Sequence, residues 1–393
     1  MGDLNSIKDT GLRDVTVAST NISDVNGAEG KLIYRGYLVK DLAEKTVYEE
    51  IVYLLLYEKL PNNEELALFK KTLAKERSIP GCIIDALKTF PKDALPMDVL
   101  QSSVAMLAPH DPDIGKGTRE ATEKSSLRII AKMATLVAAW ERIRNGKEAV
   151  APREDLSHAA DFLYMMTGVE PDPETARFFD TGLVLHAEHA FNASTFTARG
   201  IASTQAHIYA SIAGAVGSLS GPLHGGANTR VMKMLLEIGT PDKVDDYLNK
   251  ILDSGGKIMG LGHAVYKVDD PRAHILAPMS KIVGEKAGDT KWYEMSKLLE
   301  VKAKEAFKKK KGRDINVNVD FYSASLYYSM NIPMDLFTPI FAISRAAGWT
   351  AHVIEEQFAG ASPKAVLYRP ESDYTGSYCG PDECSFVPLD ERK

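Results

Sequence analysis

After Leu38 the apolar residues follow the spacing of α-helices, and the pattern persists along the rest of the chain. Val47, Ile51, Leu54 and Leu55 lie on one helical face, and Pro61 is expected to close that helix. Further helices are predicted at 127–137, 174–190, 229–238 and 292–310. The sequence therefore predicts a mainly α fold.

One short β element is expected before these helices. Residues 15–22 and 31–34 are rich in β-branched and aromatic side chains, and Asn26-Gly27 lies between them. Asn-Gly between two such runs is typical of a β-hairpin. The fold class is thus mainly α with a small N-terminal β-hairpin.

Gly225-Gly226 is a candidate hinge, and it is followed by a stretch of predicted helices. We expect residues 228–327 to form a small inserted helical domain. The remaining residues, 1–227 and 328–393, would then form one larger, discontinuous domain.

Composition excludes several classes of protein. The chain has 393 residues, a net charge of −6 and 25% charged residues, so it has no basic footprint for nucleic acid. No segment supplies the roughly 20 apolar residues of a membrane helix. There are three cysteines, Cys82, Cys379 and Cys384. So few predict no disulfide framework, and a reducing, cytoplasmic location is expected.

Three segments of the C-terminal half each present one titratable group. They are Gly-Pro-Leu-His-Gly-Gly-Ala-Asn at 221–228, Gly-Leu-Gly-His-Ala-Val-Tyr-Lys at 260–267 and Asn-Val-Asp-Phe-Tyr-Ser at 318–323. The groups are His224, His263 and Asp320. Two imidazoles and a carboxylate set in turns indicate acid/base chemistry more than core packing.

Each group also has a structural alternative. His224 precedes a helix, whose N-terminus favours the neutral imidazole, but it can also cap its own turn. His263 is flanked by glycine, which permits close ligand approach or a packed turn before the strand-like Val265-Tyr266. Asp320 has apolar neighbours that would raise its pKa, or it can be the N-cap of a helix at 323–330.

Several cationic and imidazole side chains are further candidates. Arg345 is the only charged residue between 336 and 354, so it needs either a salt bridge or an anionic ligand. Arg272 can pair with its acidic neighbours, and Arg369 carries no signal of its own. His186 and His189, three apart on the predicted helix, share a face and could bind zinc. No third ligand is evident, so no metal is predicted.

The three segments closely resemble the active-site segments of citrate synthases, including 2-methylcitrate synthases. The resemblance runs from Lys31-Leu-Ile-Tyr-Arg-Gly-Tyr to Val387-Pro-Leu-Asp-Glu-Arg. It implies a mostly helical, two-domain homodimer whose cleft closes on its substrates, acetyl-CoA and oxaloacetate. The inserted domain would be the lid and the larger domain would form the dimer. No cofactor is implied, because acetyl-CoA is a substrate.

The resemblance also implies roles. His224 would stabilise the acetyl-CoA enol, His263 would bind and protonate the ketone of oxaloacetate, and Asp320 would remove the methyl proton. Oxaloacetate would be held by His189, Arg272, Arg345 and Arg369, the last from the other subunit. Coenzyme A would contact Lys257, Ile258, Met259, Gly260, Leu261 and Lys267. The basic run at 308–313 either forms a solvated face or helps to attract the phosphates of coenzyme A.

Two positions depart from many relatives. Ala264 replaces an arginine, which leaves a coenzyme A phosphate contact open, and Gln101 replaces another arginine in the segment 96–101.

Four functions are compared on this basis. Citrate synthase is favoured, and 2-methylcitrate synthase, with propionyl-CoA as donor, is the nearest alternative. A non-catalytic CoA-binding or helical scaffold protein is a third, and a metal hydrolase using His186 and His189 is a fourth.

Overall fold

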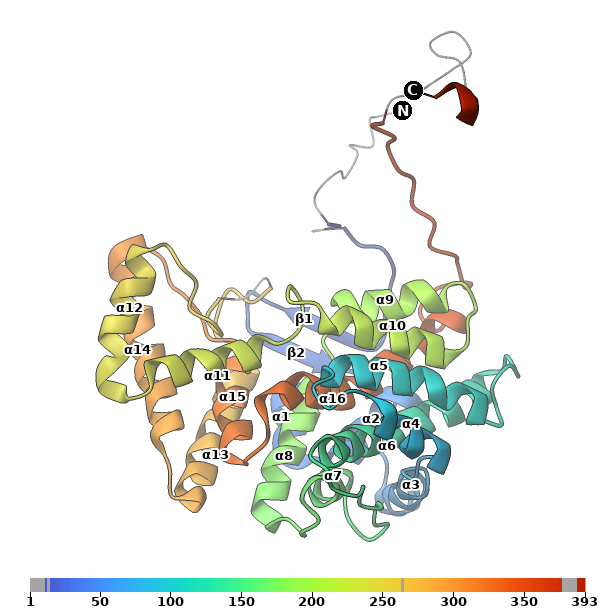
Figure 1. Ribbon diagram of the computed structural model, residues 1–393, viewed down its shortest axis with the longest axis horizontal. Coiled ribbons are helices and arrows are strands. Elements are labelled where there is room, and N and C mark those ends of the chain that lie inside the picture. Colours follow the sequence, from blue (N-terminus) through green and yellow to red (C-terminus); the bar gives the residue numbers. More distant parts are fainter. Residues whose placement is uncertain (1–10, 13–14, 263–264, 377–386, 393) are drawn as a thin grey trace.

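The computed structural model describes residues 11–12, 15–262, 265–376 and 387–392. Most of these residues are helical, as predicted (Figure 1). The first group of helices comprises α1 (Val39–Lys45), α2 (Tyr48–Tyr57), α3 (Asn63–Lys75), α4 (Gly81–Thr89), α5 (Pro96–Leu107), α6 (Arg119–Arg144), α7 (His158–Thr167), α8 (Pro173–His186), α9 (Ala193–Ala202), α10 (Ile208–Ser220) and α16 (Phe337–Gln357). Short 3-10 turns are η1 (Ala108–His110), η2 (Pro241–Lys243), η3 (Met334–Leu336) and η4 (Leu389–Glu391).

The core of this group is α16, which is buried along almost its whole length. It packs against α2, α5, α6, α8, α9 and α10. A helix that is apolar on all sides must be surrounded by others, since no face of it suits water. This position explains why Arg345, near its middle, is the one charge in a long apolar run.

The second group comprises α11 (Ala227–Ile238), α12 (Val244–Asp253), α13 (Pro271–Ala287), α14 (Lys291–Lys311) and α15 (Val319–Ser329). Helices α11, α13 and α14 pack on α15, and α12 packs on α14 (Figure 1). These helices span 227–329, and that 228–327 form a separate inserted domain stays a prediction. That 228–327 moves as a lid stays a prediction.

The predicted N-terminal hairpin is present. Strand β1 (Ser23–Asn26) pairs antiparallel with β2 (Lys31–Tyr34), and Ser23 is the cross-strand partner of Tyr34. The first strand begins at Ser23 rather than within 15–22, because β2 is only four residues long and offers no partner to earlier residues. A third strand, β3 (Tyr37–Leu38), completes the sheet and was not predicted. Residues 27–30 connect β1 to β2, so Asn-Gly is not a two-residue turn here.

Other expected boundaries need correction. Helix α8 ends at His186 rather than at 190, so His186 and His189 do not share a helical face. Helix α2 ends at Tyr57, where Glu58 is left-handed with φ 68°, before Pro61 is reached. Helix α15 begins at Val319 rather than 323, and Val265-Tyr266 is not a strand. No helix in the described ranges is long and apolar enough to cross a membrane.

Candidate active site

Five of the residues predicted to act on substrates line one cavity of about 540 Å³. They are His189, His224, Arg272, Asp320 and Arg345. They come from the turn after α8, the turn before α11, and helices α13, α15 and α16. Residues Asp24 and Val25 of β1 also line the cavity. His263 lies outside the described residues, so its position relative to this cavity stays a prediction.

His224 is held with one ring nitrogen facing the protein. Its Nε2 accepts a hydrogen bond from the backbone N–H of Ser194, at 3.1 Å, and lies 2.8 Å from the Ser194 hydroxyl. An accepting Nε2 places the proton of the neutral ring on Nδ1. Burial lowers the pKa of His224 to about 4, and the nearby charge of Arg345 contributes to that shift. The imidazole is therefore neutral near pH 7, with a proton to donate.

Asp320 lies in the first turn of α15. The N-cap of that helix is Asn318, whose side chain accepts from the N–H of Asp320, so the alternative of Asp320 as N-cap is wrong. Burial raises the pKa of Asp320 to about 6 despite the opposing charge of Arg272. A carboxylate with its pKa so raised is a stronger base than an exposed one, yet remains ionised at pH 7.

Arg345 is a buried cation whose charge faces the cavity. Its Nε donates to the carbonyl oxygen of His186 at 2.7 Å, and its guanidinium lies 4.6 Å from the centroid of the Phe341 ring. Among the described residues no carboxylate lies within ion-pairing distance of it. Burial lowers its pKa to about 10. A guanidinium so placed favours an anionic ligand, because the ligand supplies the missing counter-charge.

Arg272 lines the same cavity but already has a partner. Its Nε and Nη2 donate to the two oxygens of Asp270 at 3.0 and 2.7 Å, which is the expected alternative of pairing with an acidic neighbour. Its third nitrogen, Nη1, is 3.4 Å from the carbonyl oxygen of Leu185. Arg272 therefore offers an anion a positive charge partly balanced by Asp270.

The two histidines after α8 have separate environments. His186 is buried, its Nδ1 is 2.7 Å from the carbonyl oxygen of Gly182, and burial lowers its pKa to about 3. His189 lines the cavity, and its Nε2 is 3.2 Å from the hydroxyl of Tyr266. His186 is thus a packed histidine, whereas His189 lies at the cavity.

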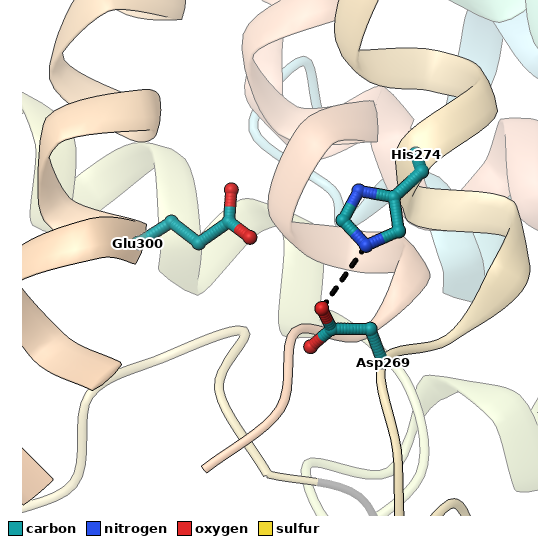
Figure 2. A group of neighbouring side chains, drawn as sticks. All are labelled: Asp269, His274 and Glu300. Atoms are coloured by element: carbon teal, nitrogen blue, oxygen red, sulfur yellow. Dashed lines mark hydrogen bonds and ion pairs between the residues drawn. The ribbon is translucent and has the colours of Figure 1, made fainter. Parts of the chain in front are cut away.

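A group of potential metal ligands occurs elsewhere, at Asp269, His274 and Glu300 (Figure 2). The ammonium of Lys304 lies 2.7 Å from Asp269 and 2.8 Å from Glu300. A cation of the protein already neutralises these carboxylates. The group is an ion-pair cluster that braces the loop leading into α13.

A second cavity of about 860 Å³ brings together the six residues expected to contact coenzyme A. These are Lys257, Ile258, Met259, Gly260, Leu261 and Lys267. Gly260 has φ 77°, and a Cβ there would lie 2.7 Å from side chains of Phe321 and Val231. Only glycine lets the loop lie this close to α11 and α15. The cavity also includes Ala227 and Asn318, which directly precede Asn228 and Val319 of the first cavity.

The basic run at 308–313 is divided between two roles. Lys308 pairs with Asp314 and Lys310 with Asp253, at exposed positions, whereas Arg313 lines the second cavity.

Two further residues singled out in the sequence do not line the first cavity. Arg369 is exposed on the C-terminal tail and does not line it. Gln101 packs against Gly217, between α5 and α10. The departure at Gln101 is therefore a matter of helix packing in this chain.

Sequence reasoning missed several residues that support the site. Ser194 holds His224, Asn228 donates its backbone N–H to Asp320, and Tyr266 meets His189. Asn192 was detectable, because Asn three residues before Thr195 is an N-cap pattern for α9. Ser194 had no such signal, since its role depends on a contact with a residue 30 positions away.

Comparison with known proteins gives a consistent result. A family model described as "Citrate synthase, C-terminal domain" matches residues 11–371. The citrate synthase of Haloferax volcanii is 44% identical over 387 residues, covering 97% of this chain and 98% of that relative. The 2-methylcitrate synthase 1 of Corynebacterium glutamicum is 38% identical over 389 residues, covering 97% and 98%.

Solved structures agree. The citrate synthase of Pyrobaculum aerophilum is 39% identical with a TM-score of 0.89, covering 97% of this chain and 95% of that chain. The citrate synthase of Thermoplasma acidophilum, solved as a ternary complex with carboxymethyl coenzyme A and oxaloacetate, is 32% identical with a TM-score of 0.87, covering 96% of this chain and 98% of that chain.

Proposed function

This chain belongs to the citrate synthase family and is an acyltransferase, and from that premise we propose how its own residues carry out the reaction. Acetyl-CoA condenses with oxaloacetate by a Claisen-type step, and water then hydrolyses citryl-CoA to citrate and CoA. The observation that carries the proposal is the placement of a neutral imidazole, a carboxylate of raised pKa and an unpaired guanidinium around one cavity.

Asp320 is the proposed base. The methyl group of a thioester is a very weak acid, so an ordinary exposed carboxylate removes its proton inefficiently. The raised pKa of Asp320 reduces the difference in pKa between the methyl group and the carboxyl group, because a stronger base is a better proton acceptor. The electrons left on the methyl carbon move into the thioester, and its oxygen gains negative charge.

His224 is the proposed donor to that oxygen. Its Nε2 accepts from Ser194, so the N–H at Nδ1 is available for the enolate. A neutral donor held by the fold stabilises the charge as it develops, without the cost of reorienting water. His263 is proposed to bind and protonate the ketone oxygen of oxaloacetate, at a position outside the described residues.

Arg345, Arg272 and His189 are proposed to hold oxaloacetate. The substrate is a dianion, and Arg345 is the cation on this wall with no carboxylate of its own among the described residues. Arg369, exposed on the tail, is proposed to reach the site of the other subunit of a homodimer.

The second cavity is proposed to hold coenzyme A, with Lys257, Lys267 and Arg313 near its phosphates. Residues 228–327 would close as a lid and exclude water until the carbon–carbon bond forms. We place the enzyme in the cytoplasm and in the tricarboxylic acid cycle. Acetyl-CoA is favoured over propionyl-CoA because several citrate synthase relatives are 44% identical to this chain, whereas the 2-methylcitrate synthase relatives are 38% and 37% identical.

The test is release of CoA thiol by the purified protein, measured with acetyl-CoA and with propionyl-CoA, each with and without oxaloacetate. We expect CoA release that depends on oxaloacetate. The kcat/KM for acetyl-CoA should be about 10- to 200-fold higher than that for propionyl-CoA, the range of discrimination that one methylene group commonly gives. A preference for propionyl-CoA would make the chain a 2-methylcitrate synthase. No release with either donor would contradict the proposed reaction.

A further inference from the structure

The turn that presents His189 to the cavity, residues 187–192, has a strained backbone. Ala190 has φ 49°, a left-handed conformation that side chains with a Cβ rarely adopt. It also lines the cavity beside His189. A non-glycine residue keeps such a conformation only where its surroundings hold it there. The question is which groups hold this turn.

The hairpin supplies two of them. The hydroxyl of Ser23, in β1, accepts a hydrogen bond from the N–H of Ala190 at 3.1 Å and donates to Glu188 Oε1 at 2.8 Å. The hydroxyl of Tyr34, in β2, accepts from the N–H of Glu188 at 3.3 Å and donates to the carbonyl oxygen of Leu185 at 3.2 Å. Ser23 and Tyr34 are cross-strand partners, so their side chains lie on the same face of the sheet.

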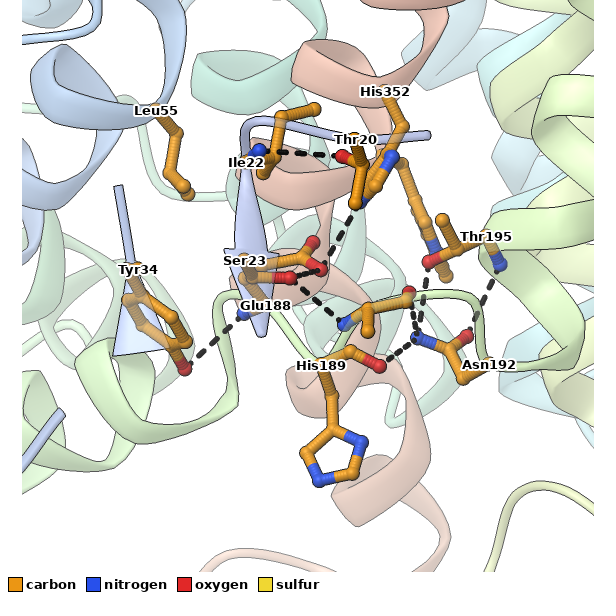
Figure 3. A network of polar contacts seen from close by, with 12 residues as sticks. Thr20, Ile22, Ser23, Tyr34, Leu55, Glu188, His189, Asn192, Thr195 and His352 are labelled. Carbon is orange, nitrogen blue, oxygen red and sulfur yellow. Dashed lines mark hydrogen bonds and ion pairs between the residues drawn. The ribbon is translucent and has the colours of Figure 1, made fainter. Parts of the chain in front are cut away.

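The fold fixes the other side of the turn. Glu188 is fully buried, and its Oε1 lies 3.1 Å from Nε2 of His352 in α16. The N–H of Gly348, also in α16, donates to the carbonyl oxygen of Ala187. Asn192 donates from its side chain to the carbonyl oxygen of His189. Figure 3 shows the contacts of Glu188 with Ser23 and His352 and that of Asn192 with His189, whose ring points away from them.

We propose that Ser23 is a positioning residue for oxaloacetate, acting through the strained turn. Its hydroxyl holds Ala190 in the left-handed conformation, and that conformation sets where His189 enters the cavity. The small sheet is thus part of the substrate site, although Ser23 does not itself contact the substrate. The inference depends on the proposed function, since it takes oxaloacetate as the ligand of His189.

The experiment compares Ser23→Ala, Ala190→Gly and the double variant. Ser23→Ala removes both hydrogen bonds, so we expect KM and Kd for oxaloacetate to rise about three- to tenfold, the size expected from losing one or two hydrogen bonds. The KM for acetyl-CoA should change little. Ala190→Gly alone is the reference for the double variant, because glycine adopts this φ without strain.

The double variant separates positioning from general damage. If Ser23 acts by holding Ala190, glycine at 190 should recover at least half of the lost oxaloacetate affinity on a logarithmic scale. The matched control is Ser126→Ala, which removes a buried hydroxyl that donates to the carbonyl of Thr122 within α6. It should lower thermal stability without changing the Kd for oxaloacetate.

Two results would overturn the inference: an unchanged Kd in Ser23→Ala, or an equal loss in the single and double variants. Kd is measured by calorimetric titration with oxaloacetate alone, so it does not depend on turnover. A protein that binds oxaloacetate but releases no CoA would contradict the proposed function instead. The two failures are thereby distinguished.

Discussion

At the scale of single residues, burial shifts two neighbouring groups in opposite directions. The pKa of Asp320 rises to about 6 and that of His224 falls to about 4, because in each case the charged form loses solvation. Above about pH 6, Asp320 is mostly ionised and His224 is neutral. A base and an uncharged donor therefore coexist near pH 7, as enolate formation requires.

The first prediction at this scale is a pH dependence. Because the ionised form of Asp320 is the proposed base, kcat/KM should fall as the pH drops through about 6, with the slope of one proton. Asp320→Asn keeps the size of the side chain but removes the proton acceptor, so kcat should fall by roughly 10²–10⁴, the usual contribution of general acid–base catalysis. Steady-state rates from pH 5 to 8 check both. A flat profile down to pH 5, or near-normal turnover of the variant, would remove Asp320 from the mechanism.

Sequence alone pointed to the titratable residues that line the first cavity better than to the residues that hold them in place. His224, Asp320 and Arg345 stood out because each is an unusual residue for its local setting. Ser23 did not, since its partner Ala190 is 167 positions away and nothing near Ser23 signals it. For Arg272 the sequence left two interpretations open, pairing with an acidic neighbour or binding of an anionic substrate. The structure shows the ion pair with Asp270.

At the scale of elements, helix existence was predictable and helix ends were not. The expected helix at 174–190 stops at His186, because the turn after it is fixed by buried contacts of Glu188 rather than by local propensity. The hairpin was predicted, but its first strand lies at Ser23–Asn26 rather than within 15–22, because only these residues face the four residues of β2. Such limits arise from tertiary contacts that a local pattern does not contain.

The second prediction concerns the tip of that hairpin. The carbonyl of Gly27 accepts from the N–H of Lys267 at 2.8 Å, and a Cβ on Gly27 would overlap the carbonyl of Val265. Gly27→Ala should therefore lower the free energy of unfolding by about 1–3 kcal/mol, as overpacking does. It should also raise the KM for both substrates, since Val265 and Lys267 line the two cavities.

The control for Gly27→Ala is Gly81→Ala. A Cβ at Gly81, the first residue of α4, would meet nothing within 4 Å. Both variants are compared by chemical denaturation and by steady-state kinetics. Equal free energies of unfolding and equal KM values would show that the hairpin tip does not constrain the loop that contains Val265 and Lys267.

At the scale of the whole molecule, the fold class was predictable because helical periodicity runs through most of the chain. The described part of the tail after α16 extends away from the helices (Figure 1). Residues 364–367 and 369–376 are exposed, and Tyr368 is half-buried against Phe196 and Glu356. Arg369 thus follows an anchored residue, is exposed and does not line its own cavity.

The third prediction uses this arrangement. Arg369→Ala and His224→Ala subunits should each be nearly inactive alone. If Arg369 acts in the partner's site, a mixed dimer has one site with both lesions and one intact site. Random exchange should then restore about a quarter of normal activity, since half of the dimers of a symmetric pair are mixed. Activity is measured after exchange is confirmed by mass spectrometry, and no recovery would place Arg369 outside the partner's site.

The anchoring of the first strand to the last long helix has a consequence for how the protein is made. The N–H of Asn21 donates to Glu355, which lies 334 positions later. At about 5–20 residues per second, the ribosome needs on the order of 15–70 s to add those residues. The hairpin therefore leaves the ribosome long before α16 exists to receive it. Until translation is nearly complete, the hairpin that lines the first cavity lacks this contact with α16.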